Sequence, residues 1–190
     1  MCSDFSRRSF HLFSGLMSCL FIVLGFCTPA QAYQVAQNSR ISSIECAANT
    51  KPLPVNNQAV LAWKASSPNQ FRDRAHIEGV LVQTYADHSG HHHYKVQIGQ
   101  SNSETVEVIY NESFGQVPAA NPGAHFEACG DYITSILPAG GYPASPDGAI
   151  IHWVHLSPKP NSHESGFMII DGKLYGMQNE NGSQNRHRKF

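Results

Sequence analysis

Short runs in which apolar and polar residues alternate constrain the fold of this chain more than any other feature. Between residues 75 and 175 these runs are separated by segments rich in Gly, Pro, Asn and Asp. A period of two is the signature of a half-buried β-strand. The pattern predicts strands at 75–85, 91–98, 105–110, 123–133 and 149–156. A terminal hairpin follows at 166–175, because Asp171-Gly172 between two apolar runs is typical of a tight hairpin turn.

The residues before these strands predict a single helix. It covers Gln58 to Lys64 and is stopped by the polar segment 66–69 that contains Pro68. We therefore expect a mainly β protein, an OB-like barrel of five to seven antiparallel strands with one short N-terminal helix. A β-sandwich is the alternative. The expected divisions are a signal peptide (1–32), a lead-in with the helix (33–74), the barrel domain (75–176) and a polar disordered tail (177–190).

The first 32 residues have the three parts of a bacterial secretory signal peptide. Arg7 and Arg8 precede an apolar run of about 16 residues, and a spanning helix needs about 20. Ala30-Gln31-Ala32 has the small residues of a cleavage site, so we expect the mature chain to begin at Tyr33. A membrane anchor is the alternative. Ser6 to Leu12 resembles a twin-arginine signal, which leaves Sec and Tat export to the periplasm or the medium both open.

Cleavage leaves two cysteines, Cys46 and Cys129, in an oxidising compartment. An even number of cysteines there predicts a disulfide, with two buried free thiols as the alternative. Loss of the signal peptide also changes the formal net charge from −1 to −2, since two arginines and one aspartate leave with it. This charge argues against a strongly basic nucleic-acid binder. No later segment is apolar enough to span a membrane.

Several spaced motifs resemble a family of small exported bacterial proteins of unknown function, DUF3465. The best match is Gly148 to His155, which reads GAIIHWVH, and further matches lie at 123–132, at His91 and Tyr94, and from Pro158 to Tyr175. The chain departs from the family pattern at Tyr110, Leu156 and Ser157 and in the insertion 137–147. The resemblance implies an OB-like fold and export. It implies no reaction, because the function of the family is itself unknown.

Histidines are the candidate functional side chains. The chain has 11, and all but His11 follow the signal peptide. Neutral imidazole is the commonest metal ligand and a general acid or base near neutral pH. The candidates for catalysis are His91, His152, His155 and His163, and a divalent metal is one candidate cofactor, with His155 and His163 as its ligands. Exposed or hydrogen-bonded histidines without a function are the alternative.

Strand geometry limits how these histidines can meet. Residues three apart on a regular strand face opposite sides, so His152 and His155 can share a site only if the strand ends or bulges at Trp153. The candidate binding residues are Trp153, His155 and His163, together with Tyr94 and Asn111. We expect most aromatic residues to pack in the core and Trp153 to be the exception. We also expect that His155→Ala or His163→Ala removes binding and leaves the melting temperature nearly unchanged.

Three functions fit this sequence. The first is a module that binds a small polar or oligomeric ligand, such as a sugar, an oligonucleotide or a metal, at a surface formed by His and Trp. The second is a histidine-based, metal-assisted hydrolase or nuclease, which requires the four histidines to cluster beside a carboxylate. The third is a structural envelope protein. The sequence has no G-x-S-x-G, glycine-rich phosphate loop or C-x-x-C motif, so it leaves open whether the protein is an enzyme. The oligomeric state is open as well.

Overall fold

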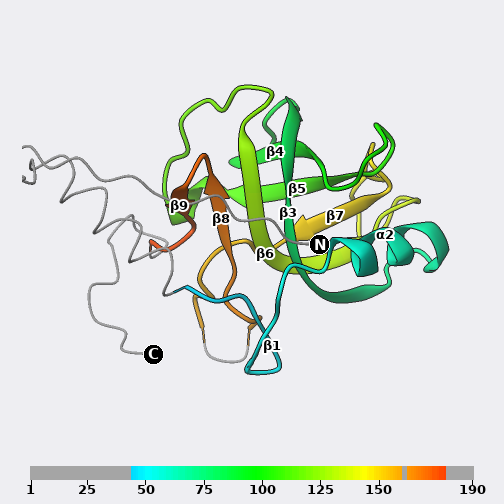
Figure 1. Ribbon diagram of the computed structural model, residues 1–190, viewed down its shortest axis with the longest axis horizontal. Coiled ribbons are helices and arrows are strands. Elements are labelled where there is room, and N and C mark those ends of the chain that lie inside the picture. Colours follow the sequence, from blue (N-terminus) through cyan, green and yellow to red (C-terminus); the bar gives the residue numbers. More distant parts are fainter. Residues whose placement is uncertain (1–43, 160–161, 179–190) are drawn as a thin grey trace, which may run out of the picture.

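A computed structural model describes residues 44–159 and 162–178, which form a closed five-stranded β-barrel with additional short elements (Figure 1). The barrel strands are β3 (Arg72–Thr84), β4 (His91–Gln97), β5 (Thr105–Asn111), β6 (His125–Thr134) and β7 (Ala149–His152). Their order around the barrel is β3-β4-β5-β7-β6, and β6 pairs with β3 to close it. The expected small OB-like barrel is confirmed. One pairing differs from the antiparallel expectation, because β5 and β7 run parallel.

The remaining elements lie outside the barrel wall. Figure 1 shows the helix α2 (Asn57–Ser66) on the right and the hairpin of β8 (Phe167–Ile170) and β9 (Lys173–Tyr175) on the left. The lead-in forms a small hairpin of β1 (Ala47–Ala48) and β2 (Lys51–Pro52) before α2, and the short 3-10 helix η1 (Glu112–Phe114) follows β5. The predicted signal peptide and most of the predicted tail lie outside the described residues. No helix in the described part is long and apolar enough to cross a membrane.

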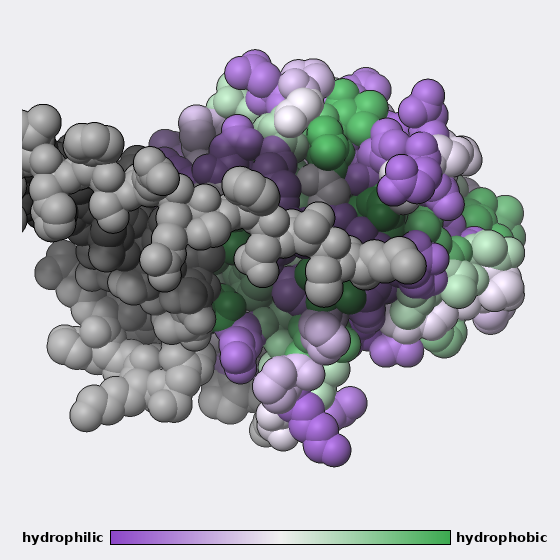
Figure 2. Space-filling model, viewed as in Figure 1, coloured by the Kyte–Doolittle hydropathy of each residue, from purple (hydrophilic) through white to green (hydrophobic). Residues whose placement is uncertain are grey.

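Alternate residues of the barrel strands fill the core. On β3, Ile77 and Leu81 are fully buried, while Val80 and Val82 are exposed, as the period of two predicts. Most aromatic residues are buried, as expected: Phe126, Tyr132 and Tyr175 lie in the main core together with Tyr94, and Phe167 lies in a second cluster beside the disulfide. The surface in the view of Figure 2 mixes polar and apolar residues. The core therefore lies inside the barrel, and the outer faces of the strands are free to carry polar groups.

One edge of β6 is shared by two strands placed end to end. Residues 131–134 pair with β7, and residues 126–129 pair with β8. Gly130 lies at the junction, where an added Cβ would clash with the carbonyl oxygen of His152 and lie 2.8 Å from Val154 Cγ1. The register between β3 and β6 continues through Gly130 without an extra residue. Gly130 thus permits close packing of the turn after β7 and does not form a bulge in the pairing of β3 and β6.

A disulfide fastens the lead-in to the barrel. The Sγ atoms of Cys46 and Cys129 are 2.06 Å apart and their Cα atoms 5.5 Å apart, which confirms the predicted bond. Arg74 reinforces the same region, because its buried guanidinium donates to Asp131 Oδ1 (2.6 Å) and to the carbonyl oxygens of Ala47 and Ser165. The lead-in, β6 and the loop before β8 are therefore held together beside the turn that follows β7.

Candidate functional site

The chain turns sharply directly after β7. The strand ends at His152, four residues earlier than predicted, and Trp153 has a φ of +53°. A left-handed backbone is unusual for a large side chain and needs support from its surroundings. Gly130 and Gly166 give that support, since a Cβ at either position would clash with the carbonyl oxygen of His152 or of Trp153. Because the strand ends before Trp153, the rule that residues three apart on a strand face opposite sides no longer separates His152 from His155. The two histidines can therefore belong to one site.

The turn and the start of β4 bring five rings into one contiguous group, here called the ring cluster: His91, His152, Trp153, His163 and His155. The ring centroids of His91 and His152 are 6.2 Å apart, and those of His152 and Trp153 are 4.7 Å apart. His163 stacks beside Trp153 at 5.7 Å and meets His155 edge-on at 5.0 Å. The four candidate histidines and Trp153 therefore converge, although residue 91 is distant from the others in sequence.

Backbone carbonyls orient three of the four imidazoles. Nδ1 of His91 lies 3.0 Å from the carbonyl oxygen of Ser89, and Nδ1 of His155 and of His163 lies 2.8 Å from that of Leu156 and of Glu164 respectively. A carbonyl oxygen only accepts hydrogen bonds, so each Nδ1 carries the proton and donates. In the neutral ring this leaves the Nε2 lone pair of each histidine for a ligand.

Burial keeps two of the imidazoles neutral. Burial, together with the neighbouring histidines His91, His155, His163 and His93, lowers the pKa of His152 to about 4. Burial also lowers the pKa of His155 to about 4, against the hydrogen bond to Leu156, which favours the charged form. At neutral pH these two rings are uncharged acceptors.

Two residues of the site were not predicted from the sequence. The Arg72 guanidinium carbon lies 5.7 Å from the centre of the Trp153 ring, a cation–π arrangement. Phe114 stacks on His155 with centroids 3.6 Å apart and an angle of 12° between the planes. Both contacts join residues far apart in sequence, so no local sequence pattern predicts them.

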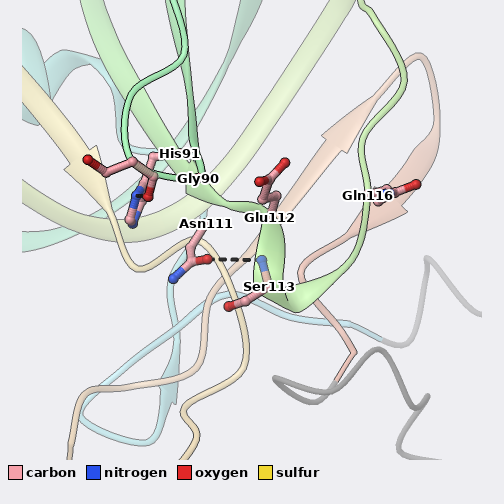
Figure 3. A pocket seen from close by; sticks show the side chains of 7 residues that line it. Gly90, His91, Asn111, Glu112, Ser113 and Gln116 are labelled. Carbon is pink, nitrogen blue, oxygen red and sulfur yellow. Dashed lines mark hydrogen bonds between the residues drawn. The ribbon is translucent and has the colours of Figure 1, made fainter.

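A polar pocket adjoins the ring cluster through His91, which belongs to both (Figure 3). Its volume is about 490 Å³, and it lies between the start of β4 and the end of β5. It is lined by Ser89, Gly90, His91, Asn111, Glu112, Ser113 and Gln116. Asn111 Oδ1 accepts a hydrogen bond from the backbone N–H of Ser113, shown dashed in Figure 3, which leaves its side-chain NH2 group to donate to a ligand. The predicted binding residue Asn111 thus lines the pocket.

Tyr94 does not belong to this surface. Only 2% of it is exposed, and its ring lies 5.4 Å from that of Phe126 in the core. It alternates with the outward-facing His93 and Lys95 along β4, so the strand period points it inward. The prediction of Tyr94 as a binding residue is corrected on this ground.

The metal and hydrolase hypotheses need additional ligands or a carboxylate at the ring cluster. Within residues 44–159 and 162–178, no three His, Cys, Asp or Glu side chains are placed to hold one metal ion. The nearby carboxylates have other partners, since Asp131 pairs with Arg74 at 2.6 Å and Glu107 pairs with His93 at 2.7 Å. In the described part of the chain, none of the four ring-cluster histidines forms a hydrogen bond or ion pair with a carboxylate.

The middle of the outer face of β4 and β5 is filled by the protein's own polar side chains. Asp147, from the loop between β6 and β7, accepts hydrogen bonds from Tyr85 (2.8 Å) and Thr105 (2.6 Å) and lies 3.3 Å from Lys95 Nζ. The Asp147 side chain is only 1% exposed. The ring cluster lies beyond this network, at the end of the barrel where β4 begins and where β5 and β7 end.

Fold and site together define a small OB-like barrel with a histidine-rich surface at one end. A scan against protein-family models gives no match, and a search of curated proteins finds no relative. The resemblance to DUF3465 therefore stays a prediction.

Proposed function

We propose that this protein is an exported binding module that holds a polar ligand at the ring cluster and the adjoining pocket. The observation that carries this proposal is the convergence of His91, His152, His155 and His163 around Trp153. Strain at Trp153, and hydrogen bonds that leave Nε2 of three histidines without a backbone partner, are typical of a built site rather than of solvent-exposed side chains.

The chemistry of the site suits a ligand rich in hydroxyl groups. The Nε2 lone pairs accept hydrogen bonds, the NH2 group of Asn111 donates, and Trp153 contributes an aromatic surface. Among the three ligands considered from the sequence, a sugar uses all of these groups. An oligonucleotide is disfavoured by the net charge of −2 expected for the mature chain.

The filled face of β4 and β5 supports this location. OB barrels commonly bind ligands on the face of their second and third strands and on the loops beside it. In this protein those strands are β4 and β5, and Tyr85, Asp147 and Thr105 occupy the middle of that face with bonds to each other. A ligand meets less competition at the barrel end, where the ring cluster and the pocket lie.

Nuclear magnetic resonance of the two tryptophan indoles tests the proposal. Trp63 packs against Phe71 and Tyr132, so its signal serves as an internal reference for Trp153. We expect at least one of glucose, an oligothymidylate and Zn²⁺ to shift the Trp153 signal and to leave that of Trp63 in place.

Two variants sharpen this test. His163→Ala should abolish the shift of Trp153, because His163 stacks on that ring. His125→Gln should retain it, because His125 is exposed, pairs with Glu78 and lies at the other end of β6. A Trp153 signal that no probe moves, or a shift that survives His163→Ala, would contradict the proposed function.

Export is the second part of the proposal. It is supported by the charged and apolar N-terminus and by the disulfide between Cys46 and Cys129, a bond typical of oxidising compartments. We predict that the intact mass of the protein recovered from the cell envelope or the medium lacks residues 1–32. Recovery of a full-length, membrane-bound species would contradict this prediction.

A further inference from the structure

The partners of the described histidines differ between the ring cluster and the rest of the barrel. Outside the ring cluster, four of the five histidines pair with carboxylates at 2.7–3.0 Å, and the fifth, His88, lies with Nδ1 3.0 Å from Ser89 Oγ. These pairs are His76–Glu127, His92–Asp87, His93–Glu107 and His125–Glu78. The four histidines of the ring cluster have no such partner among residues 44–159 and 162–178. The ring cluster thus gathers four titratable bases without the carboxylates that accompany His76, His92, His93 and His125.

Arg72 repeats this contrast among the arginines. Arg74, two residues along β3, is buried and pairs with Asp131 at 2.6 Å. Arg72 is exposed, lies over Trp153, and has no carboxylate of the described residues within ion-pair distance. A guanidinium offers parallel N–H donors that match a carboxylate or a phosphate. Arg72 therefore presents an unused anion-binding group to the ring cluster.

The titratable side chains grouped around His152 are imidazoles. His91 and His93 approach from β4, His155 and His163 from the segment after β7, and each of them disfavours a proton on His152. Asp131 on β6 lies opposite His152 in the register, but its carboxylate is bound by Arg74. Glu112, the one carboxylate that lines the pocket, lies with Oε2 3.6 Å from His92 Nε2. Glu164, next to His163, contacts Arg74 and the backbone of Thr50, so none of these described carboxylates pairs with a ring-cluster histidine, and a bound ligand can supply that group.

We propose that the ligand of the ring cluster is a sugar-sized molecule that carries a carboxylate or a phosphate. This inference rests on the proposed function. Arg72 binds the anionic group, and a ring-cluster histidine beside that group takes up a proton from solvent at Nε2 as it binds, while the other Nε2 atoms accept hydrogen bonds from the hydroxyl groups. An anion beside an imidazole favours the imidazolium form, and linkage then makes the affinity rise as the pH falls.

The sign of the pH dependence separates this proposal from its rivals. A metal ion needs neutral imidazoles, so its affinity rises with pH. A neutral sugar binds without a change of charge, so its affinity depends little on pH. Only an anionic ligand predicts tighter binding in acid.

Titration calorimetry with three matched sugars, with the indole signals recorded in parallel, tests the inference. The probes are glucuronate for the carboxylate, glucose 6-phosphate for the phosphate and glucose as the neutral control, each at pH 5.5 and pH 8. We expect one or both acidic sugars to bind about tenfold or more tightly than glucose at pH 5.5, and several-fold more weakly at pH 8. Whichever acidic sugar binds shows whether the site takes a carboxylate or a phosphate.

Charge variants complete the experiment. Arg72→Gln should remove the preference for the acidic sugar, while its melting temperature should match that of the wild type because Arg72 is exposed. Lys173→Gln, at the turn between β8 and β9, removes a cation from the other end of β6 and should keep the preference. Binding of glucose as tightly as of the acidic sugars, with a shifted Trp153 signal, overturns the inference and leaves the proposed function standing. A Trp153 signal that none of the probes moves counts against both.

Discussion

His155 is the most enclosed histidine of the ring cluster. Phe114 stacks on its ring at 3.6 Å, and only 5% of the residue is exposed. The sequence placed His155 and His163 in the same role, with binding affected and folding spared. Burial separates them, because a side chain that fills space in the core supports the fold as well as the site.

We predict that His155→Ala lowers the free energy of unfolding by about 2 kcal/mol, through the lost stacking and the cavity beside Phe114. His163→Ala should change it by less than about 0.5 kcal/mol, since His163 is only half-buried. Urea unfolding of both variants measures the difference. Equal, small changes in the two variants would show that the stacking on Phe114 contributes little.

His152 and His155 make stability depend on pH in one direction. In the unfolded chain they bind protons near the ordinary pKa of 6.5, whereas in the folded protein their pKa is about 4. The unfolded state therefore binds more protons between these values, and stability falls as the pH drops from 6.5 towards 4. Urea midpoints at pH 7.5, 6 and 4.5 should show this loss, and His152→Gln should show a weaker one. Identical profiles would contradict the assignment to His152.

At the scale of elements, β6 organises the site by pairing one edge with both β7 and β8. The gap between these two strands is where the chain leaves the sheet at Trp153 and returns at Gly166. The returning segment is tied down by hydrogen bonds from Gly166 N–H to the carbonyl of His155 and from Leu156 N–H to that of Gly176. The position of the ring cluster is therefore a consequence of how two strands share one edge.

We predict that Gly130→Ala disturbs this junction. The new Cβ would meet the His152 carbonyl and Val154, both in a tightly packed region, so we expect a loss of about 2–3 kcal/mol of unfolding free energy. The indole signal of Trp153 should move more than that of Trp63. A stable variant with an unchanged Trp153 signal would show that β6 and the turn can separate at little cost.

For the whole molecule, the disulfide is the main covalent constraint. It joins residues 83 apart, so in the chain-entropy model it stabilises the folded protein by about 4.5 kcal/mol. The variant Cys46→Ala/Cys129→Ala should lose about this amount in urea unfolding, and reductant should affect the wild type alone. A loss below about 1 kcal/mol would mean that the lead-in contributes little to the folded state.

Local pattern was enough to predict most elements of the barrel. The helix was expected at 58–64 and spans Asn57–Ser66, and the strand expected at 91–98 is His91–Gln97. The terminal hairpin and its Asp171-Gly172 turn were also expected where they occur. These features depend on side-chain period and on turn chemistry, both properties of neighbouring residues. The end of β7 was predicted too late, because the backbone at Trp153 is set by glycines from β6 and from the loop before β8.

The sequence by itself determined the fold class, the disulfide pair and the set of candidate histidines. Alternation, cysteine number and residue type can be read from the sequence without knowing which strands pair. Only the tertiary structure decided that His91 joins His152, that Tyr94 turns inward, and that Arg72 and Phe114 belong to the site. It also decided that His76, His92, His93 and His125, and not the ring-cluster histidines, pair with carboxylates. Such contacts follow from which strands pair and in which register, and pairing is a property of the closed barrel as a whole rather than of any segment of it.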